Sequence, residues 1–330
     1  MHLIITIDTE ADNQWLRPSP TTTENVRFLP RFQELCNRFD FKPTWLSTWL
    51  MVKNPVFVDF VSPHLEAGCA EVGAHIHPWT TPPIDEAVEG DGSFHAFPHE
   101  LPLELFKAKM TSLTELITDT FEAPISYRAG RYGFNETHID VLLELGYKVD
   151  CSVVPYTTIS RSPGMPGGVG GMDFRTARPH VYFPDYKDCR KPGNSTLLEV
   201  PVTVLFPKWP LRSIPALQSV LAQNDLSLIS RALNKYGYGP RWLRPSKRNS
   251  AADLIEVCRA AQKSGAPFLE MMFHSSELMP GCSPNFPDET SIERLYETFE
   301  TLFTWLRKEG VQGATLGEFA TNWLAGNKVA

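Results

Sequence analysis

The sequence lacks the features that mark several large classes of protein. Its six cysteines are widely scattered and include no CxxC pair, a pattern that fits the reduced thiols of a cytoplasmic protein better than a disulfide scaffold. No apolar run approaches the roughly 20 residues that cross a bilayer, and no basic segment precedes the apolar start at residues 3–7. We therefore expect neither a membrane span nor a signal peptide. A net charge of −7 argues against sequence-independent binding of nucleic acid.

What the sequence does contain is a regular alternation of strand-like and helix-like segments. Apolar, often β-branched runs predict strands at 3–7, 43–47, 70–74, 125–127, 147–149, 197–204, 268–273 and 311–315. Between them, apolar residues recur at helical spacing, most clearly over 106–121 and 292–306. Asn135 is the predicted N-cap of a helix that ends at Gly146, and Ser250 with Asp253 predicts a capping box at the start of another helix. Seven or eight strands alternating with helices predict an α/β fold, a (β/α) barrel that is seven-stranded and distorted. An open doubly wound sheet is the structural alternative.

Two stretches interrupt this alternation. Residues 155–196 are rich in proline and glycine, and loops this long usually form functional walls or lids unless they are disordered. Residues 236–249 carry the basic side chains Arg241, Arg244, Lys247 and Arg248. A solvated loop is the favoured interpretation of this basic cluster, and contact with an anionic substrate is the alternative. No internal repeat or domain boundary is evident, so residues 1–330 are expected to form one domain with these two insertions.

Polar residues gather where the predicted strands end. The seven that stand out, on five strands, are Asp8, Glu10, His75, His77, Arg128, Asp150 and His274. In a (β/α) barrel the carboxyl ends of all strands share one face, and the loops at that face build the active site. The pattern therefore predicts one site that draws side chains from distant parts of the chain.

His75 and His77 are the clearest metal-binding candidates. They are separated by one residue, and in an extended backbone such a pair projects to the same side, as two ligands of one ion require. Glu10 or Asp8 could supply a carboxylate, and two imidazoles with one carboxylate are typical of catalytic zinc. The alternatives are a hydrogen-bonded histidine pair and loop-stabilising acids.

Arg128 and His274 are candidates for roles in catalysis. Arg128 ends a strand and is followed by Gly130 and Gly133, which would let a substrate or a carboxylate approach closely; a surface arginine is the default alternative. His274 ends the apolar strand 268–273. It is either a hydrogen-bonded core residue or, because it titrates near neutrality, the natural general acid.

Taken together, these segments resemble the polysaccharide deacetylase family, the NodB-homology group of carbohydrate esterases. Thr6–Glu10 resembles the family's first motif, Lys42–Leu46 the following strand, and Glu71–His75 the approach to the metal-binding histidines. Arg128 matches the arginine of the third motif, and residues 271–274 match the last, which carries the catalytic histidine. The order and spread of these matches cover most of the chain.

The sequence departs from the common family pattern at two motifs. Thr9 separates the two acids that are adjacent aspartates in the common first motif, a D-x-E variant. The common spacing of three residues between the histidines would put the second ligand at Trp79. Either His77 takes that role, or His95 or His99 reaches in from the following loop. The segment around Asp150 only loosely resembles the fourth motif.

The resemblance implies a metal-dependent carbohydrate N-deacetylase, formed by one catalytic domain over residues 1–330. Its expected substrates are N-acetylated sugars of a cell-surface polysaccharide or its precursor, and its expected cofactor is one divalent ion, with zinc favoured. Glu10, His75 and His77 would hold the ion, and Asp8, steered by Arg128, would act as the base. His274, oriented by Asp150, would act as the acid. The alternatives are a non-catalytic carbohydrate-binding relative with a degenerate site and a barrel amidohydrolase.

Overall fold

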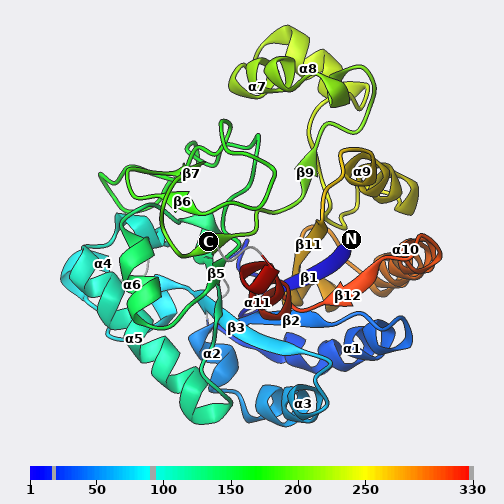
Figure 1. Ribbon diagram of the computed structural model, residues 1–330. Coiled ribbons are helices and arrows are strands. Elements are labelled where there is room, and N and C mark those ends of the chain that lie inside the picture. Colours follow the sequence, from blue (N-terminus) through cyan, green and yellow to red (C-terminus); the bar gives the residue numbers. More distant parts are fainter. Residues whose placement is uncertain (17–19, 90–93, 327–330) are drawn as a thin grey trace.

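The centre of the fold is a curled parallel β-sheet, seen in a computed structural model that describes residues 1–16, 20–89 and 94–326 (Figure 1). In spatial order its strands are β11 (Phe268–His274), β1 (His2–Thr9), β2 (Pro43–Ser47), β3 (Glu71–Ile76), β4 (Ser126–Ala129), β5 (Val149–Asp150) and β8 (Leu198–Glu199). All six neighbouring pairs are parallel. The short strand β12 (Gln312–Ala314) pairs with the first half of β1. The predicted distorted seven-stranded (β/α) barrel is confirmed.

The two edges of this sheet approach each other beyond β8. Thr203 connects them, because its backbone N–H donates to the carbonyl of Glu270 on β11 over 3.3 Å. In return, the N–H of Glu270 donates to the Thr203 hydroxyl over 2.8 Å. The strand predicted over 197–204 is thus two short strands, since β9 (Val204–Leu205) leaves the barrel to pair with β10 (Arg241–Trp242). The sequence pattern could not reveal this change of partner.

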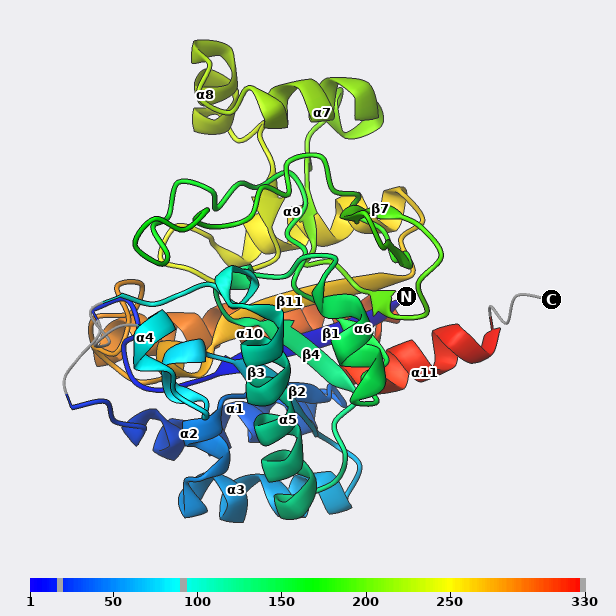
Figure 2. The same ribbon diagram turned by 90° about the vertical axis from the view of Figure 1, so that its left-hand side faces the viewer.

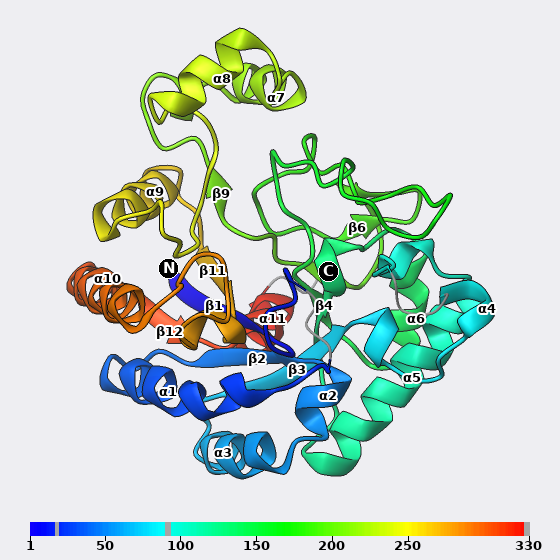
Figure 3. The same ribbon diagram turned by 180° about the vertical axis from the view of Figure 1, so that it is seen from behind.

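Helices surround the sheet, as Figures 1 and 3 show. The α-helices are α1 (Leu29–Arg38), α2 (Trp49–Val52), α3 (Pro55–Glu66), α4 (Glu86–Glu89), α5 (Leu103–Thr120), α6 (His138–Glu144), α7 (Pro215–Gln223), α8 (Leu228–Lys235), α9 (Ala251–Lys263), α10 (Glu289–Lys308) and α11 (Leu316–Gly326). Short 3-10 turns lie at Glu24–Phe28, Pro78–Thr80, Pro98–Glu100, Gly130–Tyr132, Leu211–Ser213 and Ser275–Leu278. No helix in these described ranges is long and apolar enough to cross a membrane.

Helix ends test the capping predictions. Ser250 and Asp253 form the predicted capping box at the start of α9, where each side chain accepts a hydrogen bond from the other residue's N–H. Asn135 was predicted to cap α6, but the helix begins three residues later, at His138. Asn135 instead accepts a hydrogen bond from the N–H of Thr137, which closes a turn before the helix.

The two excursions from the barrel also differ from expectation. Residues 155–196 form a mostly irregular wall that contains the small antiparallel ribbon of β6 (Pro184–Asp185) and β7 (Asp188–Pro192). The second excursion is longer than the predicted 236–249, because α7 and α8 project between β9 and β10 (Figure 2). Neither helix was predicted from the sequence.

Strand alternation divides β1 between two environments. Leu3, Ile5 and Ile7 belong to the main core shared with the surrounding helices. Ile4 faces the other side, where it joins an apolar cluster with Leu316 and its neighbours on α11. Thr6 and Asp8 continue that interior face toward the end of the strand, because successive side chains alternate. The barrel interior therefore contains an apolar cluster beside α11 and becomes polar at the end where the predicted site residues lie.

Candidate metal centre and active site

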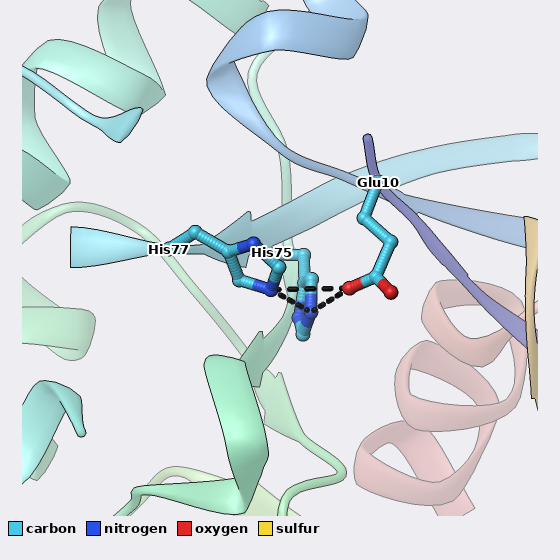
Figure 4. Close-up of side chains that lie close together, drawn as sticks. All are labelled: Glu10, His75 and His77. Atoms are coloured by element: carbon cyan, nitrogen blue, oxygen red, sulfur yellow. Dashed lines mark hydrogen bonds and ion pairs between the residues drawn. The ribbon is translucent and has the colours of Figure 1, made fainter. Parts of the chain in front are cut away.

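Glu10, His75 and His77 form one compact cluster at the ends of β1 and β3 (Figure 4). His75 and His77 lie on the same side of the extended chain, as their spacing predicted, and all three side chains are buried. The Nε2 atoms of the two histidines are 3.1 Å apart. Glu10 Oε2 lies 3.2 Å from Nε2 of His77 and 3.8 Å from Nε2 of His75.

These separations fit a single metal ion. Ligand atoms held about 2.0–2.1 Å from one zinc ion at tetrahedral angles lie about 3.3 Å from one another. Two ring nitrogens and one carboxylate oxygen are also the donor set of many catalytic zinc sites. The donors of Glu10, His75 and His77 thus match an ion in both chemistry and spacing.

Neighbouring groups orient both imidazoles. The Nδ1 of His75 lies 3.0 Å from the carbonyl oxygen of Arg128. Because a carbonyl can only accept, Nδ1 carries the hydrogen and leaves the Nε2 lone pair directed at the cluster. The ring of His77 stacks on Trp79 with centroids 4.3 Å apart. Gly130 lets this ring approach, since a Cβ at that position would lie 2.8 Å from Cδ2 of His77.

His95 and His99, the alternatives to His77, lie elsewhere. The ring of His95 stacks on Trp79, with centroids 3.9 Å apart, and His99 Nε2 bonds the carbonyl of Gly170. In the described ranges, the cluster with metal-ligand spacing contains only Glu10 and the two histidines of the His-x-His segment. Trp79 occupies the place that the common family spacing would give to a ligand, and it supports His77.

Arg128 is fully buried inside the barrel and holds Asp8. Its Nη1 donates to Asp8 Oδ1 over 2.6 Å, and its Nη2 donates to Glu270 over 2.7 Å and to Thr6 over 2.8 Å. Its Nε donates to the carbonyl of Cys151 over 3.1 Å. Burial acts to raise the pKa of Asp8, but Arg128, His75 and His274 outweigh burial and lower that pKa below its ordinary value. Asp8 is consequently a fixed carboxylate with one oxygen free to face the pocket.

His274 lies opposite, with Nε2 3.8 Å from Asp8 Oδ2. Its Nδ1 is 3.2 Å from Glu277 Oε2, and Arg244 Nη2 donates to the same oxygen over 2.9 Å. Asn285 donates to the other oxygen of Glu277 over 2.7 Å. Burial acts to lower the pKa of His274, but the carboxylates of Glu10 and Glu277 outweigh burial and raise it. The arrangement favours a protonated imidazole held by a carboxylate.

Sequence reasoning missed Glu277 and Arg244. Glu277 follows His274 by three residues in a 3-10 turn, so this acid was detectable as a local partner of the histidine. Arg244 was noted only within the basic cluster 241–248, for which a solvated loop was favoured. Arg244 is half-buried behind His274 and donates to Glu277, so that interpretation is wrong for Arg244. Glu270 was also missed, although an acid inside the apolar strand 268–273 is itself a signal of a buried partner.

The structure does not bring Asp150 to this cluster. Its chain neighbours Val149 and Cys151 belong to the apolar interior cluster with α11, so alternation turns Asp150 to the outer face of the sheet. There Asp150 accepts hydrogen bonds from the N–H and hydroxyl of Ser152 and pairs in register with Glu199. The predicted contact with His274 is therefore wrong, and Glu277 occupies that position instead.

Asp150 and Glu199 are both fully buried carboxyl groups, and burial raises the pKa of each. A raised pKa in the folded state stabilises the fold below the unfolded values near 4. That stabilisation is lost as pH rises through the raised values. Glu199→Gln should remove most of this decrease in stability with rising pH. The variant lacks one of the two carboxyl groups, and its amide can donate a hydrogen bond to the ionised form of Asp150. Between pH 5 and 7 the wild type should lose up to about 1 kcal/mol per pH unit more than the variant.

Denaturant unfolding of both proteins across this pH range, with a chelator present, measures the difference. If the stability of the wild type and of Glu199→Gln changed with pH in the same way, the raised pKa values of this pair would not contribute to stability as predicted.

The pocket in front of these groups has a volume of about 280 Å³. Its lining, within the described residues, consists of Asp8, Glu10, Gln14, Trp15, His75, His77, Trp79, His95, Arg131, Tyr132 and His274. Trp15 packs edge-on against His274, with ring centroids 4.9 Å apart. The cluster, the carboxylate and the histidine thus open into one space that has aromatic walls.

Comparison with known proteins identifies solved structures that share this fold. No family model matches the sequence, and no curated protein matches it. A candidate polysaccharide deacetylase of Mycobacterium smegmatis is similar in structure, with 15% identity and a TM-score of 0.54 over 100% of this chain and 91% of that one. A candidate glycoside hydrolase/deacetylase of Parabacteroides distasonis has 14% identity and a TM-score of 0.62 over 98% of this chain and 71% of the other.

The same fold also carries a different activity. A branching enzyme of the GH57 type from Pyrococcus horikoshii matches with 10% identity and a TM-score of 0.51, over 100% of this chain and 71% of that one. At such identities the likeness shows the fold alone. The chain therefore has the barrel of a group that includes proteins described as deacetylases and a branching enzyme, and its chemistry must be argued from its own site.

Proposed function

We propose that this protein is a metal-dependent carbohydrate N-deacetylase whose catalytic domain spans residues 1–330. The observation that carries the proposal is one pocket that combines a metal-ligand cluster with two separately held proton-transfer groups. The ligand cluster is Glu10, His75 and His77, and the proton-transfer groups are Asp8 and His274. The fold shared with the deacetylase-type proteins of M. smegmatis and P. distasonis supports the same activity.

Each proton-transfer group is suited to one direction of transfer. Asp8 is held through Oδ1 by Arg128, which leaves Oδ2 to take a proton from the attacking water. His274 is held through Nδ1 by Glu277, which leaves Nε2 to give a proton to the departing amine. Glu10, His75 and His77 would hold one divalent ion, with zinc favoured, and such an ion polarises a carbonyl and lowers the pKa of bound water. The chain thus supplies a base and an acid on two sides of one pocket.

The aromatic walls favour a sugar as substrate. Trp15 and Tyr132 offer apolar ring surface on which the face of a sugar ring can pack. We infer that the substrate is an N-acetylated sugar of a cell-surface polysaccharide or its precursor. All six cysteines are free thiols, which supports the inference of a cytoplasmic protein.

Acetate release tests the activity and metal content tests the ligand set. We expect the zinc-loaded protein to release acetate from N-acetylated oligosaccharides and to lose this activity on chelation. His77→Ala should lose both the bound metal and the activity, because it removes one of three ligands. His95→Ala is the matched control, since it changes the other candidate histidine on Trp79 and should retain the metal.

Two outcomes would contradict the proposal in different ways. A protein that holds zinc and binds N-acetylated oligosaccharides without releasing acetate would be a non-catalytic relative. Loss of metal in His95→Ala but not in His77→Ala would overturn the ligand set while leaving the activity in place. Formate release, measured from N-formylated sugars in parallel, distinguishes deformylation from deacetylation.

A further inference from the structure

The segment 206–240, here called the hairpin, stands away from the barrel and carries α7 and α8 (Figures 1 and 2). It holds about a tenth of the chain but half of the exposed large apolar residues of the described ranges. These are Trp209, Ile214, Leu217, Val220, Leu226, Leu228, Ile229 and Tyr236. The residue that begins α8, Leu228, is 82% exposed. Such a concentration of exposed apolar surface marks an interaction site.

The sequence of α8 shows that this exposure is patterned. Leu228, Ile229, Ala232, Leu233 and Tyr236 recur at helical spacing and form one apolar face. In α10 the same kind of spacing produces a stripe that is entirely buried against the core. In α8 the face is mostly in solvent, with Leu233 half-buried. Within the described part of the chain, the apolar face of α8 therefore has no core to pack on.

The charge of the hairpin is opposite to that of the whole protein. It contains four cationic residues, Lys208, Arg212, Arg231 and Lys235, against the single acid Asp225, whereas the chain carries −7. Asp225 is itself occupied, because it pairs with Arg161 and Arg175 from the neighbouring wall. The hairpin thus presents apolar side chains together with positive charge.

A pocket of about 470 Å³ at the base of the hairpin is also lined by basic side chains. Arg178, His180 and Arg212 line it, and its described lining contains no aspartate or glutamate. Cationic side chains around a cavity without acids suit an anionic group such as a phosphate. This cavity lies outside the 280 Å³ pocket of the candidate active site.

We propose that the hairpin docks the protein on the surface of an anionic lipid bilayer. Helices with one apolar and one basic face lie in the interface of such membranes, where apolar burial adds to attraction by anionic headgroups. Trp209 and Tyr236, both largely exposed, are the residue types enriched at that interface. A second copy of the chain fits this surface less well than an anionic bilayer does, because two hairpins packed together would bring their positive charges close to one another. This inference does not depend on the proposed deacetylase activity.

The hairpin is joined directly to the candidate active site. Its stem is the ribbon of β9 and β10, and Trp242 of β10 packs edge-on against Tyr132 in the pocket wall, with centroids 5.9 Å apart. Two residues further on, Arg244 holds Glu277. The hairpin is therefore connected through its stem to a segment that also supports His274.

Co-sedimentation of the full chain with vesicles tests the proposal. Vesicles of phosphatidylcholine alone are compared with vesicles of phosphatidylcholine and phosphatidylglycerol in equal parts, at low and high salt. We expect binding to the anionic vesicles only, weakened by salt. The double variant Leu228→Ser/Ile229→Ser should weaken binding by at least about tenfold, and Arg231→Glu/Lys235→Glu should have a similar effect.

A matched control is available on the opposite side of the molecule. Lys53→Glu/Val56→Ser changes one exposed cation and one exposed apolar residue at the start of α3, and should bind as the wild type does. Absence of wild-type binding to either vesicle would overturn the proposal, as would equal binding by all variants. Light scattering tests whether a second copy of the chain binds this surface instead. The proposal would also be overturned if the wild type were a dimer that does not bind vesicles and the Leu228→Ser/Ile229→Ser variant were a monomer. The surface would then be an interface between two copies of the chain.

Discussion

Asp8→Asn is expected to lower the rate of acetate release by at least about 100-fold, and by as much as about 10⁴-fold, while the bound metal is retained. The amide cannot take a proton from water, but it keeps nearly the size of the carboxylate and can still accept from Arg128. Asp8 lies beside the ligand cluster and not within it. Turnover of an N-acetylated oligosaccharide and metal content of the same preparation check both halves of the prediction.

Glu10→Gln is the matched control because it makes the same chemical change two residues away. This variant should lose metal affinity by more than the 10–100-fold that is typical of groups outside the ligand set. If Asp8→Asn keeps full activity, Asp8 is not the base. If it loses the metal while Glu10→Gln retains it, the two acids have exchanged roles.

Arg128→Met is expected to destabilise the fold by about 3–5 kcal/mol. The guanidinium is fully buried between Asp8 and Glu270, and its removal leaves both carboxylates without their counter-ion. It also removes the donors to Thr6 and to the Cys151 carbonyl. Chemical denaturation near neutral pH measures the change in the free energy of unfolding.

Arg27→Met provides the comparison for this change. Arg27 pairs with Glu24 at the surface, with 69% of its side chain exposed, so its loss should alter stability by less than about 0.5 kcal/mol. If the methionine variant does not fold, the same measurement is made on Arg128→Lys, which keeps the positive charge. It should still be destabilised, since an ammonium cannot reproduce the planar array of donors. Unfolding of Arg128→Met at the wild-type denaturant concentration would contradict a supporting role for the arginine.

The parts of the site that sequence reasoning anticipated are those set by local geometry. His75 and His77 share a side because an extended backbone alternates. Asp8, Glu10, Arg128 and His274 meet because parallel strands end at the same face of a barrel. Periodicity and position along the chain were enough for these residues, and the structure brings them into one cluster and its surroundings.

The misjudged residues depend on contacts that local patterns do not encode. Asp150 ends a strand like the others, but a short strand of two residues left its facing undetermined, and packing against α11 turned it outward. Arg244 looked like a loop cation until the β9–β10 ribbon carried it behind His274. The hairpin was missed because its helices are short and most of its large apolar residues are exposed instead of packed in the core.

The sequence by itself therefore determined the barrel, the end of the barrel that carries the chemistry, and the residue types present there. These follow from strand and helix periodicity, which act over a few residues. Only the tertiary structure decided which acid partners which base. Glu277 and not Asp150 holds His274, His77 and not His95 or His99 joins His75, and Glu270 shares Arg128 with Asp8. Each of these choices depends on which side chains distant strands bring within about 3 Å in a medium without water, where an unpaired charge is too costly to leave.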